Sequence, residues 1–215
     1  MTQVFSRRAE LGVKLVVLGV AGVAVAALAS AAAALRGSLV IGEPMSQPIP
    51  FSHKHHVGDD GLDCRYCHTT VETQAFAGMP STRTCLGCHS QLFAQASVLA
   101  PLHESAATRR PIAWNRVHFL PQFVYFDHSI HLAKGVGCVE CHGRVDQMPI
   151  EWRAQPLQMQ WCLSCHRDPL PHLRAPADVF TLSAPRATPQ EAARLAQALG
   201  LHDTRRLTDC STCHR

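Results

Sequence analysis

The residues with the clearest chemistry are the ten cysteines, which all fall into one repeated pattern. In each copy, two cysteines stand three positions apart and a histidine follows the second. This spacing attaches a c-type haem, because the two thiols bind the porphyrin and the imidazole binds the iron. The C-x-x-C-H units occupy residues 64–68, 85–89, 138–142, 162–166 and 210–214.

A single C-x-x-C-H unit would be a weak signal, because C-x-x-C also occurs in zinc sites and redox pairs. Five units that use every cysteine predict five covalently bound c-type haems, with zinc modules or a disulfide framework as the alternatives. The thiols predicted to carry the haems are Cys64, Cys67, Cys85, Cys88, Cys138, Cys141, Cys162, Cys165, Cys210 and Cys213. The predicted proximal iron ligands are His68, His89, His142, His166 and His214.

A second pattern, F-x-H-x-x-H, occurs at residues 51–56 and again at 126–131, and each copy precedes two haem units. Matching residues of the segments 51–89 and 126–166 lie 74 to 77 positions apart, which indicates an internal duplication. The fifth haem unit, at 210–214, is then an addition at the C-terminus.

The histidines of this pattern are His53 with His56 and His128 with His131, and each pair shares one face if its segment is helical. The two members of a pair are too close in sequence to lie on opposite sides of one porphyrin. We therefore expect them to bind two neighbouring irons, one each. His55, between the first pair, is expected to face outward.

Four such ligands leave one iron without a distal partner. His118 is the first candidate because apolar residues suited to a haem edge surround it in W-N-R-V-H-F-L-P. Met159, in Q-M-Q-W-C before the fourth unit, is the second, and a thioether ligand would raise the potential of its haem. Weaker candidates are Met148, His172 and His202. His103 is expected to have a packing or surface role.

A run of 21 uncharged residues, 15–35, predicts a helix that could cross a membrane. At ~1.5 Å per residue it would span about 30 Å, the thickness of a bilayer core. Arg7, Arg8 and Lys14 precede the run, which places the N-terminus in the cytoplasm by the positive-inside rule. The alternative is a cleaved signal peptide, since residues 29–31 resemble a cleavage site.

These observations divide the chain into four predicted parts: a cytoplasmic N-terminus (1–14), a transmembrane anchor (15–36), a linker (37–50) and a periplasmic pentahaem domain (51–215). Only 6% of the residues are aromatic, so the haems are expected to complete a small core. We predict a mainly α and irregular fold, a haem-packed multihaem cytochrome c domain without strands. Thr188 to Glu191 forms a capping-box pattern, which predicts a helix from Pro189 that ends at Gly200.

The formal charge of +4 does not indicate nucleic-acid binding. Ten haem propionates, with five ferric haems at roughly +1 each, would change the balance to about −1.

Longer stretches resemble one family: residues 114–131 (W-N-R-V-H-F-L-P-Q-F-V-Y-F-D-H-S-I-H), 135–148 (G-V-G-C-V-E-C-H-G-R-V-D-Q-M), 157–167 (L-Q-M-Q-W-C-L-S-C-H-R) and 207–215 (L-T-D-C-S-T-C-H-R). Together with the N-terminal anchor they look like the pentahaem cytochrome subunit of bacterial alternative complex III. The resemblance covers most of residues 50–174 and about the last ten residues. Residues 175–205 match no motif of that family.

The resemblance implies an electron-transfer subunit of a quinol-oxidising respiratory or photosynthetic complex, which passes electrons to a periplasmic cytochrome or a terminal oxidase. Its implied partners are an iron–sulfur subunit, quinone-binding integral membrane subunits and a monohaem cytochrome c. No nucleophile-and-base set is apparent, so the chain is not expected to be an enzyme on its own. The F-x-H-x-x-H pattern also resembles the class III multihaem cytochromes. That likeness implies that His53 binds the iron of His68 and His128 that of His142, while His56 and His131 bind two others.

Two other function classes agree less well with the sequence. A membrane-anchored multihaem quinol dehydrogenase would bind quinol itself, but such proteins use a methionine just after C-x-x-C-H. Two residues after the first four haem histidines this chain has Thr70, Gln91, Arg144 and Asp168, none of which is methionine. A sensing module would need an open haem, whereas this chain has enough histidines to fill every site.

Overall fold

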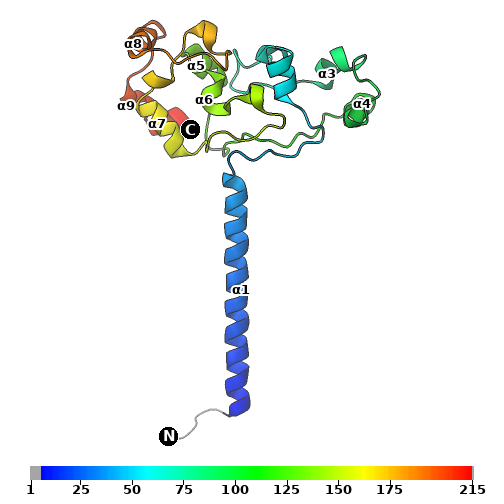
Figure 1. Cartoon of the computed structure of the whole chain (residues 1–215). Helices are drawn as coiled ribbons and strands as arrows, with labels where there is room; N and C mark the ends of the chain where they lie inside the picture. The colour runs from blue at the N-terminus through cyan, green and yellow to red at the C-terminus, as the bar shows by residue number, and fades with distance from the viewer. Residues whose placement is uncertain (1–5, 215) are drawn as a thin grey trace. The chain divides into compact units, whose positions relative to one another are not determined.

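The computed structural model describes residues 6–214, apart from the side chains of 33–39, and the chain forms two compact units, Met1–Val40 and Ile41–Arg215 (Figure 1). The first unit contains α1 (Arg7–Leu39), which begins where the Ser6 hydroxyl accepts a hydrogen bond from the amide of Ala9. Residues Arg7–Ala32 are the one stretch among the described residues that is long and apolar enough to cross a membrane. The predicted span at 15–36 lies within α1, and part of the predicted segment 1–14 lies outside the described residues.

The second unit consists of short helices joined by irregular chain. They are η1 (Lys54–Asp59), α2 (Cys64–Cys67), α3 (Thr82–His89), η2 (Ser97–Leu99), α4 (Ala100–Thr108), α5 (His128–Ala133), α6 (Cys138–His142), η3 (Val145–Gln147), α7 (Met159–Arg167), η4 (Leu170–His172), η5 (Pro176–Asp178), α8 (Pro189–Ala198), α9 (Thr204–Leu207) and α10 (Cys210–Cys213). Within residues 41–214, β-pairing is limited to two isolated bridges, Pro44 with Trp152 and Val136 with Leu173. The predicted mainly α and irregular fold is therefore confirmed.

The predicted capping box at the start of α8 is also confirmed. The Thr188 hydroxyl accepts from the amide of Glu191, and the Glu191 carboxylate accepts from the amide of Thr188 at 2.9 Å. Pro189 fills the first helical position, where its missing N–H has no consequence. Gly200 follows the helix at φ +58°, a backbone conformation that glycine adopts without strain.

The protein part of the core is small. Its main cluster joins Ile49 to Leu99 and Leu102, and Leu86 of α3 packs against it. None of the short helices that carry the cysteines has a fully buried residue. Within this unit α3 and α4 lie at one end and α7 to α9 at the other, with α5 and α6 nearer the latter (Figure 1).

Candidate haem sites

Each C-x-x-C-H unit is built on a short helix that places its two thiols on one face. Side chains cap three of these helices: the carboxylates of Asp63 and Asp209 and the hydroxyl of Ser81 each accept a backbone hydrogen bond from the first turn. Residues three apart lie on the same side of a helical turn, and the histidine follows where the turn ends. All ten cysteines are free, so the structure contains no disulfide framework.

Seven of the predicted iron ligands hold their rings in the same way. In each, Nδ1 lies 2.7–3.1 Å from a backbone carbonyl oxygen. A carbonyl oxygen can only accept, so Nδ1 carries the proton and Nε2 keeps its lone pair. Metal-binding histidines are oriented by this kind of outer hydrogen bond. The seven are His56, His68, His89, His128, His131, His166 and His214.

Three histidine pairs are spaced to bind one iron between them. With metal–nitrogen bonds of about 2.0 Å, two imidazoles on opposite sides of one iron have ring centres about 6 Å apart. The observed separations are 6.1 Å for His56 with His89, 6.1 Å for His131 with His166 and 6.4 Å for His128 with His142. The residues therefore fit c-type haem. They place His128 and His131 at two different units, and they place His56 at the 85–89 unit.

The phenylalanine of this pattern has a structural role that the sequence analysis did not assign. Phe51 stacks on His56 at 4.5 Å, and Phe126 stacks on His131 at the same distance. Each phenyl ring also meets the first histidine of its pair edge-on, at 5.0 Å and 4.8 Å respectively. The two copies therefore share one ring geometry, although His56 lies in the π-helical turn η1 and His131 lies in the α-helix α5.

The carboxylate of Glu151 lies between two histidines, which sequence reasoning missed. One oxygen is 3.6 Å from Nδ1 of His53 and the other is 3.3 Å from Nδ1 of His118. The amide of Met45 donates a hydrogen bond to the Glu151 carbonyl and so holds this part of the chain. The Arg153 side chain donates to the carbonyl of Val117, and this contact keeps the next residue, His118, close to Glu151.

The charges at this cluster favour an ionised carboxylate. Burial acts to raise the pKa of Glu151, but the hydrogen bond from His118 and the proximity of His53 hold it below its ordinary value. Burial also lowers the pKa of His53. For His142, burial with the adjacent His118 lowers the pKa to about 3, so the ring is neutral.

The two candidates for the remaining distal ligand lie in different places. The His118 ring packs edge-on against the His142 ring, and the two ring centres are 4.3 Å apart, which is too close for an iron between them. The proximal histidine of the last unit, His214, instead stacks on Phe123. Met159 is the exposed first residue of α7, one turn before Cys162.

The weaker candidates for a distal iron ligand lie in other environments. Met148 is buried beside η1, and His202 is exposed. Nδ1 of His172 lies 2.9 Å from the Glu140 carboxylate, which also accepts from Arg174 and Arg186. The His55 side chain is 56% exposed and lies near Asp59 and Asp60, as expected for a residue that faces outward.

The thiols of different units lie close together. Cys64 and Cys138 share a hydrogen bond, which lowers the pKa of Cys64 to about 7 and raises that of Cys138. At three other cysteines burial raises the pKa, and a thiol from another unit adds to the effect. These pairs are Cys67 with Cys85, Cys141 with Cys165, and Cys162 with Cys213.

Together these electrostatic neighbours indicate one spatial order of the units: 85–89, 64–68, 138–142, 162–166, 210–214. Cys88 and Cys210 are the two exposed cysteines, and they belong to the first and last units of that order.

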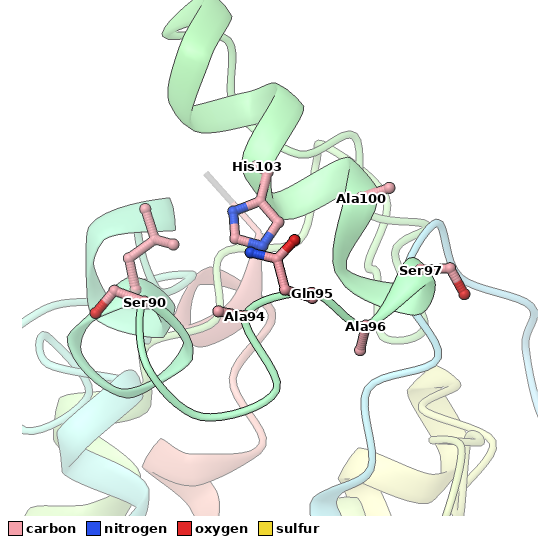
Figure 2. Close-up of a pocket in the computed structure, with 8 residues that line it drawn as sticks. Ser90, Ala94, Gln95, Ala96, Ser97, Ala100 and His103 are labelled. Atoms are coloured by element: carbon pink, nitrogen blue, oxygen red, sulfur yellow. The ribbon is translucent and has the colours of Figure 1, made fainter.

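A cavity of about 610 Å³ lies beside α3, on the flank that carries Leu86 and Ser90. His103 projects from α4 toward the loop that contains Gln95 (Figure 2). Its Nε2 is buried without a hydrogen-bond partner.

The fold and these sites resemble those of multihaem cytochromes c, a class of electron-transport proteins. Residues 124–215 match the family described as cytochrome c7 and related cytochrome c. The chain is also 34% identical over 131 residues to a protein of Nitratidesulfovibrio vulgaris named menaquinone reductase, multihaem cytochrome c subunit. That alignment covers 60% of this chain and 56% of the relative, so the chain spans a little over half the relative's length.

Proposed function

We propose that this chain is an electron-conducting subunit with five covalently attached c-type haems. The helix at residues 15–36 anchors it in the bacterial cytoplasmic membrane, with the N-terminus in the cytoplasm and the haem domain in the periplasm. Bound haem c supplies reversible one-electron Fe(III)/Fe(II) chemistry.

The main observation in support of this proposal is the fixed orientation of the histidine rings. Their Nδ1 atoms donate to carbonyl oxygens, so each ring presents Nε2 in one fixed orientation. Imidazoles on both sides leave an iron no open position for a substrate, which favours electron transfer over chemistry at the metal. The chain by itself is then a carrier, and catalysis belongs to the complex that contains it.

The order of the units supports a path across the domain. The units 85–89 and 210–214 stand at its two ends and carry the two exposed thiols, so partner proteins can approach there. We propose Met159 as the distal ligand at the 210–214 unit, because it stands one turn before Cys162, whose thiol neighbours Cys213. His118 would then act beside the 138–142 unit, where its ring lies against His142.

The proposed setting is a quinol-oxidising membrane complex of the alternative complex III type. Its other members would be quinone-binding integral membrane subunits, an iron–sulfur subunit and a monohaem cytochrome c. The sequence resemblance supports this setting, as does the similarity to a subunit of a menaquinone reductase.

Intact-mass analysis of the mature protein tests the haem count, with five haems expected per chain. A Cys210→Ser/Cys213→Ser variant, which should carry one haem fewer, serves as the reference. Co-purification from detergent tests the setting, because the partners should accompany the chain. Quinol oxidation by the isolated chain would instead favour a quinol dehydrogenase.

A further inference from the structure

Glu151 gives two of the predicted ligands, His53 and His118, a partner of a different kind from the carbonyl oxygens that face seven others. Seven ligands donate from Nδ1 to a neutral carbonyl oxygen, whereas Nδ1 of His53 faces a carboxylate at 3.6 Å. The same carboxylate lies 3.3 Å from Nδ1 of His118, whose ring packs against His142. Glu151 therefore stands beside the 138–142 unit and beside His53, the ligand expected for the 64–68 unit, and these two units are neighbours in the spatial order.

The cluster is well shielded from water. The side chains of Glu151, His53 and His118 are 23%, 19% and 15% exposed. Coulombic interactions between such groups are several-fold stronger than between groups in bulk water. In addition, Nδ1 of His53 and Nε2 of His118 are buried without a hydrogen-bond partner. A negative charge held here therefore acts strongly on its surroundings.

We propose that Glu151 is a positioning residue that fixes His53 and His118 and lowers the reduction potentials of the haems at the units 64–68 and 138–142. The inference rests on the proposed function. A carboxylate charge 3.6 Å from Nδ1 of His53 polarises the imidazole without a hydrogen bond and makes it a stronger donor to iron, which stabilises Fe(III) over Fe(II). Its charge acts in the same direction at His142, through the His118 ring.

The consequence is a domain whose central haems have low potentials and whose ends have higher ones. Electrons then reside at the units 85–89 and 210–214, which carry the exposed thiols, rather than in the middle. A thioether from Met159 would raise the potential at one end further.

The test is a potentiometric titration of the full-length haem-loaded protein in detergent, comparing wild type with Glu151→Gln. Glutamine keeps the shape and removes the charge. Two components of the titration should move to higher potential. Each should gain about tenfold in its ferrous-to-ferric ratio, which is about 59 mV for one electron. Glu151→Asp should restore most of the wild-type curve.

The matched control is Glu72→Gln, which removes an exposed carboxylate 3.7 Å from Arg65, within the 64–68 unit. This variant should leave the curve unchanged. An unshifted Glu151→Gln curve, or an equal shift in both variants, would overturn the inference.

A second variant keeps the inference testable if Glu151→Gln does not accumulate. His118→Phe preserves a ring against His142 but breaks its link to the carboxylate, so one component alone should move. No movement would refute the role of His118. A haem count below five would contradict the proposed function, whereas five low-spin haems with unshifted potentials would contradict only this inference.

Discussion

Replacing His56 with alanine is expected to open one iron and leave the others with two axial ligands. The His56 ring lies 6.1 Å from that of His89, so the iron held by the 85–89 unit loses its distal ligand. His55 cannot substitute, because its exposed ring points toward Asp59 and Asp60. The neighbouring His53 is expected to serve a different unit, 64–68.

The size of the effect follows from the number of haems and from the contacts of the His56 ring. One of five irons becomes high-spin, which removes about one-fifth of the low-spin signal, and its potential rises because it loses an imidazole. The lost stacking on Phe51 at 4.5 Å should lower the free energy of unfolding by about 1 kcal/mol.

Electron paramagnetic resonance measures the spin states, and carbon monoxide binding to the reduced protein counts open irons. We expect one carbon monoxide per chain for His56→Ala and none for wild type. His53→Ala should also open one iron, that of the 64–68 unit, with a different spectrum. His55→Ala is the matched control and should match wild type. If His55→Ala opened an iron while His56→Ala did not, the ligand assignment from ring geometry would be wrong.

Three further changes have defined outcomes. Met159→Ala should open one iron, which carbon monoxide binding would report, whereas an unchanged spectrum would exclude this thioether. Glu140→Ala leaves Arg174, 5% exposed, without its carboxylate and should lower the unfolding free energy by about 3 kcal/mol in denaturant titrations. Burial raises the pKa of Glu140, but hydrogen bonds from Arg186 and His172 hold it below 4.5, so its stabilisation is present above pH 4.5 and is lost as the pH falls further. Replacing residues 1–40 with a cleavable signal peptide should release the compact unit from residue 41 into the soluble periplasmic fraction, and retention in the membrane fraction would contradict the anchor.

Local patterns made most of the fold predictable. The capping box and Pro189 define the start of α8, and Gly200 defines its end, because these signals depend on neighbours in sequence. The haem units likewise carry their chemistry within five residues. The outward position of His55 followed from its place between two residues that share one face.

Long-range contacts could not be predicted in the same way. Glu151 belongs to no motif, and it reaches His53 because the chain near residue 45 pairs with the chain near 151. The location of His118 likewise depends on the hydrogen bond from Arg153 to Val117. The π-helical form of η1 was also not predicted, since the sequence shows a pair of histidines but not the pitch between them.

The hydrogen bond between Cys64 and Cys138 has a consequence for biogenesis. These thiols belong to different units, 74 residues apart in sequence, and the pKa of Cys64 near 7 makes it partly thiolate at neutral pH. Thiolates are the form that oxidises to disulfides, and the periplasm is an oxidising compartment. A chain that folded before its cofactors were attached would bring these two sulfurs together, and a disulfide between them would block both units at once. We therefore expect cofactor attachment to precede the final packing of the domain.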